Sequence, residues 1–384
     1  MSFSPFDHQC MATALKLAAR GLFSPHPNPR VGCVISNGQN ILGRGWHEFA
    51  GGPHAEIAAL RDTREGVKGS TAYITLEPCS HHGRTPPCTE TLLSAGISRV
   101  VVASLDPNPQ VNGQGLKKLR NAGLTVESGL MADEAEALNP GFFMRMRKGR
   151  PWVRVKSAIS LDGRTALGNG DSKWISSEAS RRDVQKWRAR SSAVLTGIGT
   201  VLADNPAMNV RLDNNQPGQN GQNWQPGRHR QDGQPPGRQP LRIIADSRWR
   251  TPPGSRILAD PATAIIAGTR DVAVPPELEA TGAQCISLPA VAGRTDLVAL
   301  FSRLAEMELN EVQVEAGAHL CGALLKDRLV DELLIYQAPH LLGKGGPGPF
   351  NFGPLESMDE RTHLKLLESR RLGNDWRLRL EPQY

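Results

Sequence analysis

The chain lacks long apolar runs and contains few cysteines. No stretch approaches the roughly 18 consecutive apolar residues of a transmembrane helix, and the opening sequence MSFSPFDHQC lacks the basic and apolar regions of a secretory signal. We therefore expect a cytoplasmic protein with no membrane partner. Six cysteines in 384 residues are too sparse for a disulfide framework. We expect Cys10, Cys33, Cys285 and Cys321 to be small buried side chains, whereas Cys79 and Cys88 stand apart.

Aromatic residues are also scarce, at 5% of the chain. The formal net charge of +7 favours anionic partners, but the basic residues are scattered along the sequence. A nucleic-acid groove typically combines a basic stripe with aromatic platforms for the bases. We therefore expect a small phosphorylated molecule as the partner, and no nucleic acid.

Candidate helices and strands alternate along the chain, which predicts two successive α/β domains with largely parallel sheets. One polar helix is predicted over residues 131–149, and a new strand begins at Trp152. We place the domain boundary there, giving a first domain over residues 1–147 and a second over 148–384. Residues 213–240 are polar and rich in Pro and Gly, which predicts a surface insertion in the second domain.

Three residues of the first domain have the chemistry of zinc ligands. His54 follows Pro53 in GGPHAE, and Cys79 and Cys88 bracket the stretch CSHHGRTPPC. A catalytic zinc site commonly uses three N or S ligands from the protein and keeps one position open. The three residues therefore predict a catalytic zinc site, although a structural zinc knuckle or a plain loop remains an alternative. A fourth ligand from His81 or His82 would close the open position.

Glu56 lies two residues beyond His54 at the start of a predicted helix, where its side chain can reach the same pocket. A carboxylate beside a zinc-activated water can take its proton and deliver it elsewhere, so we predict that Glu56 is the catalytic proton shuttle. His-x-Glu followed by Pro-Cys and a second Cys is the signature of zinc nucleobase deaminases. The signature has two residues between the cysteines, whereas eight intervene here.

Several strings occur together in an order that resembles one bacterial family. They are HPNPRVGCVI, GGPHAE, LEPCSHHGRTPPC and DPNPQVNGQG in the first half, and SLDGRTA, DSKWISS, VLTGIGTVLADNP and VEAG in the second. They resemble the bifunctional deaminase/reductase of riboflavin biosynthesis over nearly the whole chain, apart from residues 213–240. The resemblance implies an N-terminal three-layer α/β/α domain of the cytidine-deaminase fold and a C-terminal α/β domain similar to dihydrofolate reductase. We also expect a homo-oligomer, either a dimer or a tetramer.

The same resemblance implies two reactions with Zn²⁺ and NADPH as cofactors. The first would hydrolytically deaminate 2,5-diamino-6-ribosylamino-4(3H)-pyrimidinone 5′-phosphate, and the second would reduce the ribosyl group with NADPH to give 5-amino-6-ribitylamino-uracil 5′-phosphate. Asn28, in the Pro-Asn-Pro turn, would hold the base or sugar of the first substrate. The alternative is an asparagine that serves only its turn.

In the second domain the resemblance assigns contacts that the residues alone do not. NADPH would contact Ala158, Trp174, Thr200, Asp204, Ser247 and Gly317, and the substrate would contact Ser172, Arg188, Met208, Arg211 and Glu315. Both arginines suit a phosphate because guanidinium forks bind phosphate oxygens bidentately, although either could be a solvated charge. Without the resemblance, the pattern predicts only an anion site where a strand meets a helix at Gly317, since no strand leads into Gly-x-Gly-x-x-Gly.

Two other classes of protein compete with this interpretation. A nucleic-acid cytidine or adenosine deaminase with an accessory domain would use the same zinc set, but it calls for more aromatic residues than the chain has. A non-catalytic zinc-binding module would have no need for Glu56. Neither class accounts for both halves of the chain, so we predict a bifunctional enzyme.

Overall fold

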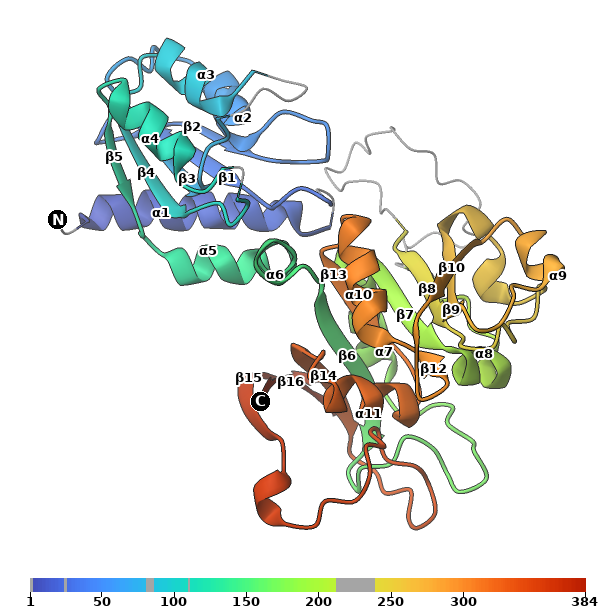
Figure 1. Ribbon diagram of the computed structural model, residues 1–384. Helices are drawn as coiled ribbons and strands as arrows, with labels where there is room; N and C mark the ends of the chain where they lie inside the picture. Colours follow the sequence, from blue (N-terminus) through green and yellow to red (C-terminus); the bar gives the residue numbers. More distant parts are fainter. Residues whose placement is uncertain (1–2, 24–25, 81–85, 110, 212–238) are drawn as a thin grey trace, which may run out of the picture. The chain divides into compact units, whose positions relative to one another are not determined.

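A computed structural model of the chain describes residues 3–23, 26–80, 86–109, 111–211 and 239–384. The described residues divide between Gly149 and Arg150 into two compact units (Figure 1). The predicted insertion 213–240 lies outside the described residues except for Gln239 and Pro240. In the described part of the chain, no helix combines the length and apolar character that crossing a membrane requires.

The first unit consists of one five-stranded sheet and its helices. The strands follow the order β2-β1-β3-β4-β5, in which β1 is antiparallel to both of its neighbours and β3, β4 and β5 are parallel. In chain order the elements are α1 (Pro5–Ala18), the 3-10 helix η1 (Ala19–Phe23), β1 (Gly32–Ser36), β2 (Ile41–Trp46), α2 (Ala55–Asp62), β3 (Thr71–Leu76), α3 (Cys88–Ser94), β4 (Arg99–Ser104), α4 (Gln114–Asn121), β5 (Thr125–Ser128), α5 (Ala132–Leu138) and α6 (Pro140–Lys148).

Helices cover both faces of this sheet. Apolar side chains of α2, α3 and α4 pack on one face and those of α1 and α5 pack on the other, so the unit has three layers (Figure 1). The central strand β3 contributes to both clusters, with Ala72 and Ile74 on one face and Tyr73 on the other. A strand that is buried on both faces tends to be rich in apolar residues throughout, and the sequence TAYITL has this composition.

The helix that begins after His54 lies unusually close to the sheet. A Cβ atom at Gly45 would come within 2.3 Å of the Ala59 nitrogen, and one at Gly43 would come within 2.3 Å of the Ala59 oxygen. Two glycines on β2 therefore allow α2 to pack directly on the strand. This close packing fixes the N-terminus of α2, and with it the position of His54.

The single polar helix predicted over residues 131–149 is two helices in the structure, α5 and α6, which meet at Asn139. Pro140 has no N–H group and disfavours the helical conformation of the residue before it, so the helix must restart there. The second helix is also not polar throughout, because Phe142 and Phe143 are buried. Proline at the first helical position was the signal for this break.

The second unit has a nine-stranded sheet in the order β10-β9-β8-β7-β13-β6-β14-β16-β15. Seven strands from β10 to β14 are parallel, and the C-terminal hairpin β16-β15 adds two antiparallel strands. The elements are β6 (Trp152–Ser160), α7 (Glu178–Arg190), β7 (Ala193–Gly197), α8 (Ile198–Asp204), β8 (Leu241–Ala245), η2 (Arg256–Leu258), η3 (Pro261–Thr263), β9 (Ala264–Thr269), α9 (Pro276–Glu279), β10 (Gln284–Leu288), β11 (Ala290–Val291), β12 (Arg294–Thr295), α10 (Leu297–Glu306), β13 (Glu311–Val314), α11 (Ala318–Lys326), β14 (Glu332–Ala338), η4 (Met358–Glu360), β15 (His363–Leu372) and β16 (Asp375–Gln383).

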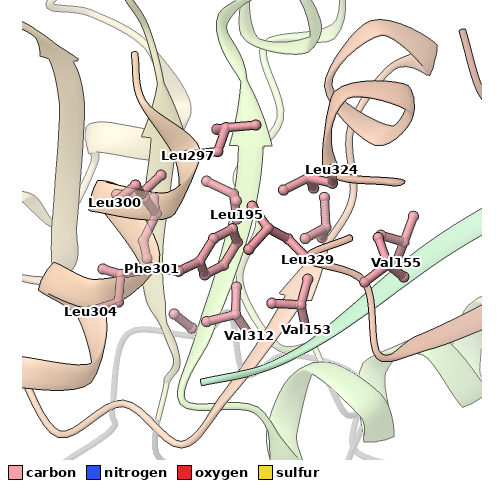
Figure 2. Packing of buried hydrophobic residues seen from close by; sticks show 14 of the residues in the cluster. Val153, Val155, Leu195, Leu297, Leu300, Phe301, Leu304, Val312, Leu324 and Leu329 are labelled. Carbon is pink, nitrogen blue, oxygen red and sulfur yellow. The ribbon is translucent and has the colours of Figure 1, made fainter. Parts of the chain in front are cut away.

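The larger core of this unit lies between the sheet and the pair α10 and α11. Figure 2 shows Phe301 of α10 beside Leu195 and Val312 of the sheet, with Leu300 and Leu304 on the same helix. The opposite face packs against α7 and α8. Helices on both faces of a mainly parallel sheet place loops with free polar groups at the carboxyl ends of the strands, where ligands of such folds bind.

Candidate functional site

The three predicted zinc ligands stand at the starts of helices or beside them. His54 is the N-cap of α2, Cys88 is the first residue of α3, and Cys79 lies in the loop after β3. The backbone N–H of Cys88 donates to Cys79 Sγ at 3.3 Å. The free N–H groups of a helix N-terminus favour negative charge, so they suit a sulfur that binds metal as a thiolate.

The donor atoms of His54, Cys79 and Cys88 all lie within 4.8 Å of one another. His54 Nδ1 is 3.2 Å from Cys88 Sγ and 3.6 Å from Cys79 Sγ. Ligands held about 2.0–2.3 Å from a tetrahedral zinc ion are roughly 3.4–3.8 Å apart, so one nitrogen and two sulfurs at these separations fit zinc. His81 and His82 lie outside the described residues.

The two cysteines differ in their tendency to ionise. The hydrogen bond with Cys88 lowers the pKa of the Cys79 thiol, and the hydrogen bond with His54 acts in the same direction against the effect of burial. The same pairing raises the pKa of Cys88, and burial adds to that rise. One thiolate is therefore already favoured at Cys79, and a cation between the sulfurs would favour the second.

Glu56 lies in the first turn of α2 and is only 3% exposed. Burial raises the pKa of its carboxyl group, although the nearby charge of His54 opposes the rise. The carboxyl group is also close enough to Cys88 to affect the ionisation of that thiol. Glu56 therefore faces the three donors from inside the unit without joining them as a fourth member.

Asn28 contacts a histidine that sequence reasoning missed. Asn28 Nδ2 lies 3.0 Å from His47 Nε2, and His47 Nδ1 lies 2.9 Å from the carbonyl oxygen of Pro53. A carbonyl can only accept, so Nδ1 carries the proton and Nε2 accepts from Asn28. Burial lowers the pKa of His47, which favours this neutral form. The sequence signal for His47 was its place between a predicted strand and the GGPHAE turn.

In the second unit, Arg188 and Glu315 form a bidentate ion pair. Arg188 Nε and Nη2 donate to the Glu315 carboxylate at 2.6 and 2.8 Å, and Nη1 donates to the Asn209 carbonyl at 2.8 Å. The sulfur of Met208 is 3.7 Å from Arg188 Nη2. Three of the predicted substrate contacts thus meet in space. The fork of Arg188, which we expected to face a phosphate, is held by Glu315, whereas the side chain of Arg211 is exposed.

Lys156 is a further member of this cluster that the sequence analysis did not single out. It lies on β6, and its charge interacts with both Glu315 and Arg188. Its ammonium group stands 6.0 Å from the centre of the Tyr336 ring. Burial lowers the pKa of Lys156, while the carboxylate of Glu315 opposes that change. The sequence gives no clear signal for it, because Arg154 and Lys156 stand at alternate positions of WVRVKSAIS and resemble the exposed face of a strand.

The other predicted contacts gather at the carboxyl edge of the parallel sheet. Ala158 is near the end of β6, Ser172 and Trp174 are in the loop that follows, Thr200 and Asp204 are in α8 directly after β7, Ser247 follows β8, and Gly317 follows β13 as the N-cap of α11. Trp174 is 71% exposed, with the guanidinium of Arg181 4.5 Å from its ring centre. Parallel strands end at one edge, so the topology brings these residues to one side of the unit.

The fold and the His/Cys/Cys group together define a two-unit α/β enzyme whose first unit is of the zinc deaminase class. The family model "Cytidine and deoxycytidylate deaminase zinc-binding region" matches residues 4–104, and "RibD C-terminal domain" matches residues 151–378. The chain is 48% identical to the riboflavin biosynthesis protein RibD of Escherichia coli, over 96% of this chain and 97% of that protein. It is 36% identical to RibD of Aquifex aeolicus, with 96% of each chain covered.

Solved structures agree with these matches. The structure of Acinetobacter baumannii RibD is similar with a TM-score of 0.87 and 43% identity, covering 98% of this chain and 99% of that one. A deaminase/reductase from Thermotoga maritima has a TM-score of 0.82 at 31% identity, with the same coverage. The chain belongs to the RibD family of riboflavin biosynthesis, whose members are bifunctional deaminases and reductases that use zinc and NADPH. The predicted family, fold class, enzyme class and cofactors are confirmed.

Proposed function

We propose that the protein catalyses two consecutive steps on a phosphorylated pyrimidine. It would deaminate 2,5-diamino-6-ribosylamino-4(3H)-pyrimidinone 5′-phosphate and then reduce the ribosyl side chain with NADPH to a ribityl group. One observation carries the proposal: the donor atoms of His54, Cys79 and Cys88 lie together, and the buried Glu56 lies next to them. The deaminase would occupy residues 1–147 and the reductase residues 148–384.

For the deamination we assign His54, Cys79 and Cys88 as the zinc ligands and Glu56 as the catalytic residue. Zinc, when bound, supplies a Lewis acid that makes water acidic enough to attack near neutral pH. Glu56 would take the proton from the attacking water and deliver it first to the ring nitrogen and then to the departing amino group. The raised pKa of its buried carboxyl supports this role, since it makes the carboxylate a better proton acceptor than an exposed glutamate.

Asn28 would orient the pyrimidine or its sugar through its side-chain amide. His47 accepts from Nδ2, which turns the oxygen Oδ1 of the amide away from the histidine. That oxygen is then directed to accept hydrogen bonds from a ligand. The partly buried hydrogen bond from His47 to the Pro53 carbonyl keeps the pair in one orientation.

For the reduction we assign the polar end of the substrate site to Arg188, Glu315 and Lys156, and we assign further substrate contacts to Met208, Arg211 and Ser172. NADPH, when bound, supplies the hydride. We assign its contacts to Ala158, Trp174, Thr200, Asp204, Ser247 and Gly317. Arg188 would hold the Glu315 carboxylate in place, and Lys156 would offer a cation to an oxygen of the substrate.

A coupled assay tests the two steps together. Purified protein is given the diaminopyrimidinone phosphate. Ammonia release is followed with and without NADPH, and NADPH oxidation is followed in the reactions that contain NADPH. We expect ammonia in both cases and NADPH oxidation only after ammonia appears. Ammonia release that requires NADPH, or NADPH oxidation that precedes ammonia, would contradict the proposed order of the reactions.

We also propose that the protein is a cytoplasmic homo-oligomer. The edge strand β15 supports oligomer formation because most of its side chains are exposed, including Leu364, Leu366 and Leu367 at 44%, 56% and 41%. Exposed apolar edge strands tend to pair with another chain. The six cysteines are all unpaired, which suits a reducing compartment. Light scattering on the Leu366→Lys variant should give a smaller mass than the parent protein gives.

A further inference from the structure

The junction between α5 and α6 is tied to the turn that carries Asn28. The side-chain oxygen of Asn139 accepts from the backbone N–H of Arg30 at 2.7 Å, and its Nδ2 donates to the Arg30 carbonyl at 2.9 Å. Asn139 is 4% exposed and lies 109 positions from Arg30 in the chain. One amide therefore satisfies both backbone groups of a buried residue, much as a neighbouring strand would.

The side chain of Arg30 strengthens the same connection. Its Nη1 donates to the Leu138 carbonyl at 2.6 Å, and its Nη2 lies 3.3 Å from Nε2 of His26. Arg30 is 3% exposed, so these hydrogen bonds are shielded from water. The segment from His26 to Arg30 is thus held to the end of α5, and Asn28 lies in the middle of the segment.

Helix α6 also supports the strand end that leads to the cysteine ligands. Phe142 and Phe143 pack with Leu76, the last residue of β3, and Val31 lies against the same cluster. Leu76 is three residues before Cys79. The matched family regions end at residue 104 and resume at 151, so α5 and α6 belong to neither.

We propose that Asn139 is a positioning residue for the deamination: its amide fixes the His26–Arg30 segment and thereby sets the orientation of Asn28 toward the pyrimidine. The segment from α5 to α6 is then a part of the deaminase site and not only a connection to the second unit. This inference rests on the proposed role of Asn28 in binding the substrate.

The expected consequence is a loss of substrate binding with little change in the chemical step. Without the Asn139 amide the turn can relax and Asn28 samples other orientations, while His54, Cys79, Cys88 and Glu56 keep their own supports. An interaction made equally with the bound substrate and the transition state affects KM and leaves kcat unchanged. We expect KM for deamination to rise roughly 5- to 50-fold, as for other buried hydrogen bonds that are left unsatisfied.

The test uses the full chain with two substitutions, Asn139→Ala and Asn139→Asp. The aspartate keeps an acceptor for the Arg30 N–H but loses the donor to the Arg30 carbonyl, so it remains informative if the alanine variant does not fold. Asn121→Ala, at the exposed end of α4, is the matched control. We expect a raised KM, full zinc content and normal reduction of the already deaminated substrate in the Asn139 variants, and parent values for the control. An unchanged KM with activity that falls only in step with zinc content or folded fraction would mean a merely structural role.

A double-mutant cycle with Asn28→Ala tests whether Asn139 affects substrate binding through Asn28. If Asn139 acts through Asn28, Asn139→Asp should add almost nothing once Asn28 is alanine. Effects on KM that multiply instead would overturn the inference. An unchanged KM in Asn28→Ala alone would overturn the proposed role of Asn28 and with it this route, whereas an unchanged KM in the Asn139 variants alone would overturn only the present inference.

Discussion

Glu56, which is buried, and Glu315, whose side chain is 10% exposed, both lie at proposed active sites, yet their pKa values are shifted in opposite directions. Burial raises the pKa of Glu56, and the partial compensation by His54 does not cancel it. Burial also acts to raise the pKa of Glu315, but the charge and hydrogen bonds of Arg188 outweigh it and lower the pKa from 4.5 to about 2. The presence of a bidentate arginine therefore decides whether a buried carboxyl group exchanges protons easily or stays charged.

The two centres also differ in what holds them together. The deaminase centre gathers residues 54–88 around a site for one metal ion, so its integrity depends on that ion. The reductase centre consists of groups that neutralise one another, since Arg188 and Lys156 face Glu315. Removing a zinc ligand should therefore abolish deamination. Removing one member of the Arg188–Glu315 ion pair should only weaken the reduction.

The largest effect is expected for Cys79→Ser. A serine hydroxyl is a poor zinc ligand, so we expect zinc loss and deamination below detection, with reduction of the already deaminated substrate retained because the second unit has its own core. Metal analysis and separate assays of the two steps measure this. Cys285→Ser, a partly buried cysteine in the second unit, should keep both activities. A folded Cys79→Ser protein that has lost both activities would mean that the two centres are not independent.

The next effect in size is expected for Glu56→Gln. The amide has the shape of the carboxyl group but cannot carry the proton, so deamination should fall about 10²- to 10⁴-fold while zinc is retained. Ammonia release and metal content are measured on the same preparation. Near-normal ammonia production with full zinc would exclude Glu56 as the proton shuttle.

A smaller effect is expected for Arg188→Ala. Losing a charge-assisted contact typically costs about 1.5–3 kcal/mol, which corresponds to roughly 10- to 150-fold in the kcat/KM of the reductase. Arg182→Ala is the matched control, because Arg182 lies on the same helix with its side chain 67% exposed. Ammonia release should be unchanged in both variants. Equal losses of reductase activity in the two would show that the helix, and not the ion pair, matters.

We also expect the stability difference between the parent protein and Arg188→Ala to depend on pH. Because the folded pKa of Glu315 is depressed from 4.5 to about 2, its ion pair stabilises the fold above pH 4.5 and loses that contribution as the pH falls toward 2. The variant lacks this contribution at every pH. The difference in Tm between parent and Arg188→Ala should therefore shrink as the pH is lowered from 6 into the window below 4.5. A difference that stays constant would contradict the assigned pKa shift.

The zinc group could be found from the sequence because its chemistry lies in short strings with special residues. His54, Cys79 and Cys88 each follow a proline closely, and helix starts are among the features that local sequence specifies well. The reductase cluster is different, because Arg188 and Glu315 are 127 positions apart and meet only when α7 packs on the sheet. Only the family resemblance suggested that both residues contact the substrate, and the guanidinium chemistry of Arg188 alone did not predict that Glu315 would hold its fork.

Buried charges inside strands were the least predictable feature. Arg154 is 1% exposed, donates to Glu332 at 3.0 Å and lies 4.5 Å from the ring centre of Trp187. In the sequence, Arg154 and Lys156 look like the exposed half of an alternating strand. Arg154 instead pairs with Glu311 of β13 and Glu332 of β14, and Lys156 interacts with Glu315, which follows β13. No local pattern reveals which distant strand will supply the opposite charge.

The smallest effect is expected for deletion of residues 214–237, within the stretch for which the sequence predicts a polar insertion. The residues that flank it are already joined, since the side chain of Gln239 accepts from the Val210 N–H at 2.8 Å and donates to the Val210 carbonyl at 3.1 Å. The backbone N–H of Arg211 also donates to Gln185 at 2.8 Å. A shorter connection between ends that are held together changes the loop-closure entropy only slightly, so both activities and the Tm should stay close to the parent values.

Gln239→Ala in the full-length chain provides the contrast to this deletion. It removes the amide that joins the two ends, so it should lower the Tm more than loss of the 214–237 segment does. It should also affect the reductase more than the deaminase, because Val210 follows Met208 and Asn209, both of which contact Arg188. A deletion that proves more harmful than Gln239→Ala would mean that residues 214–237 contribute directly to one of the two sites.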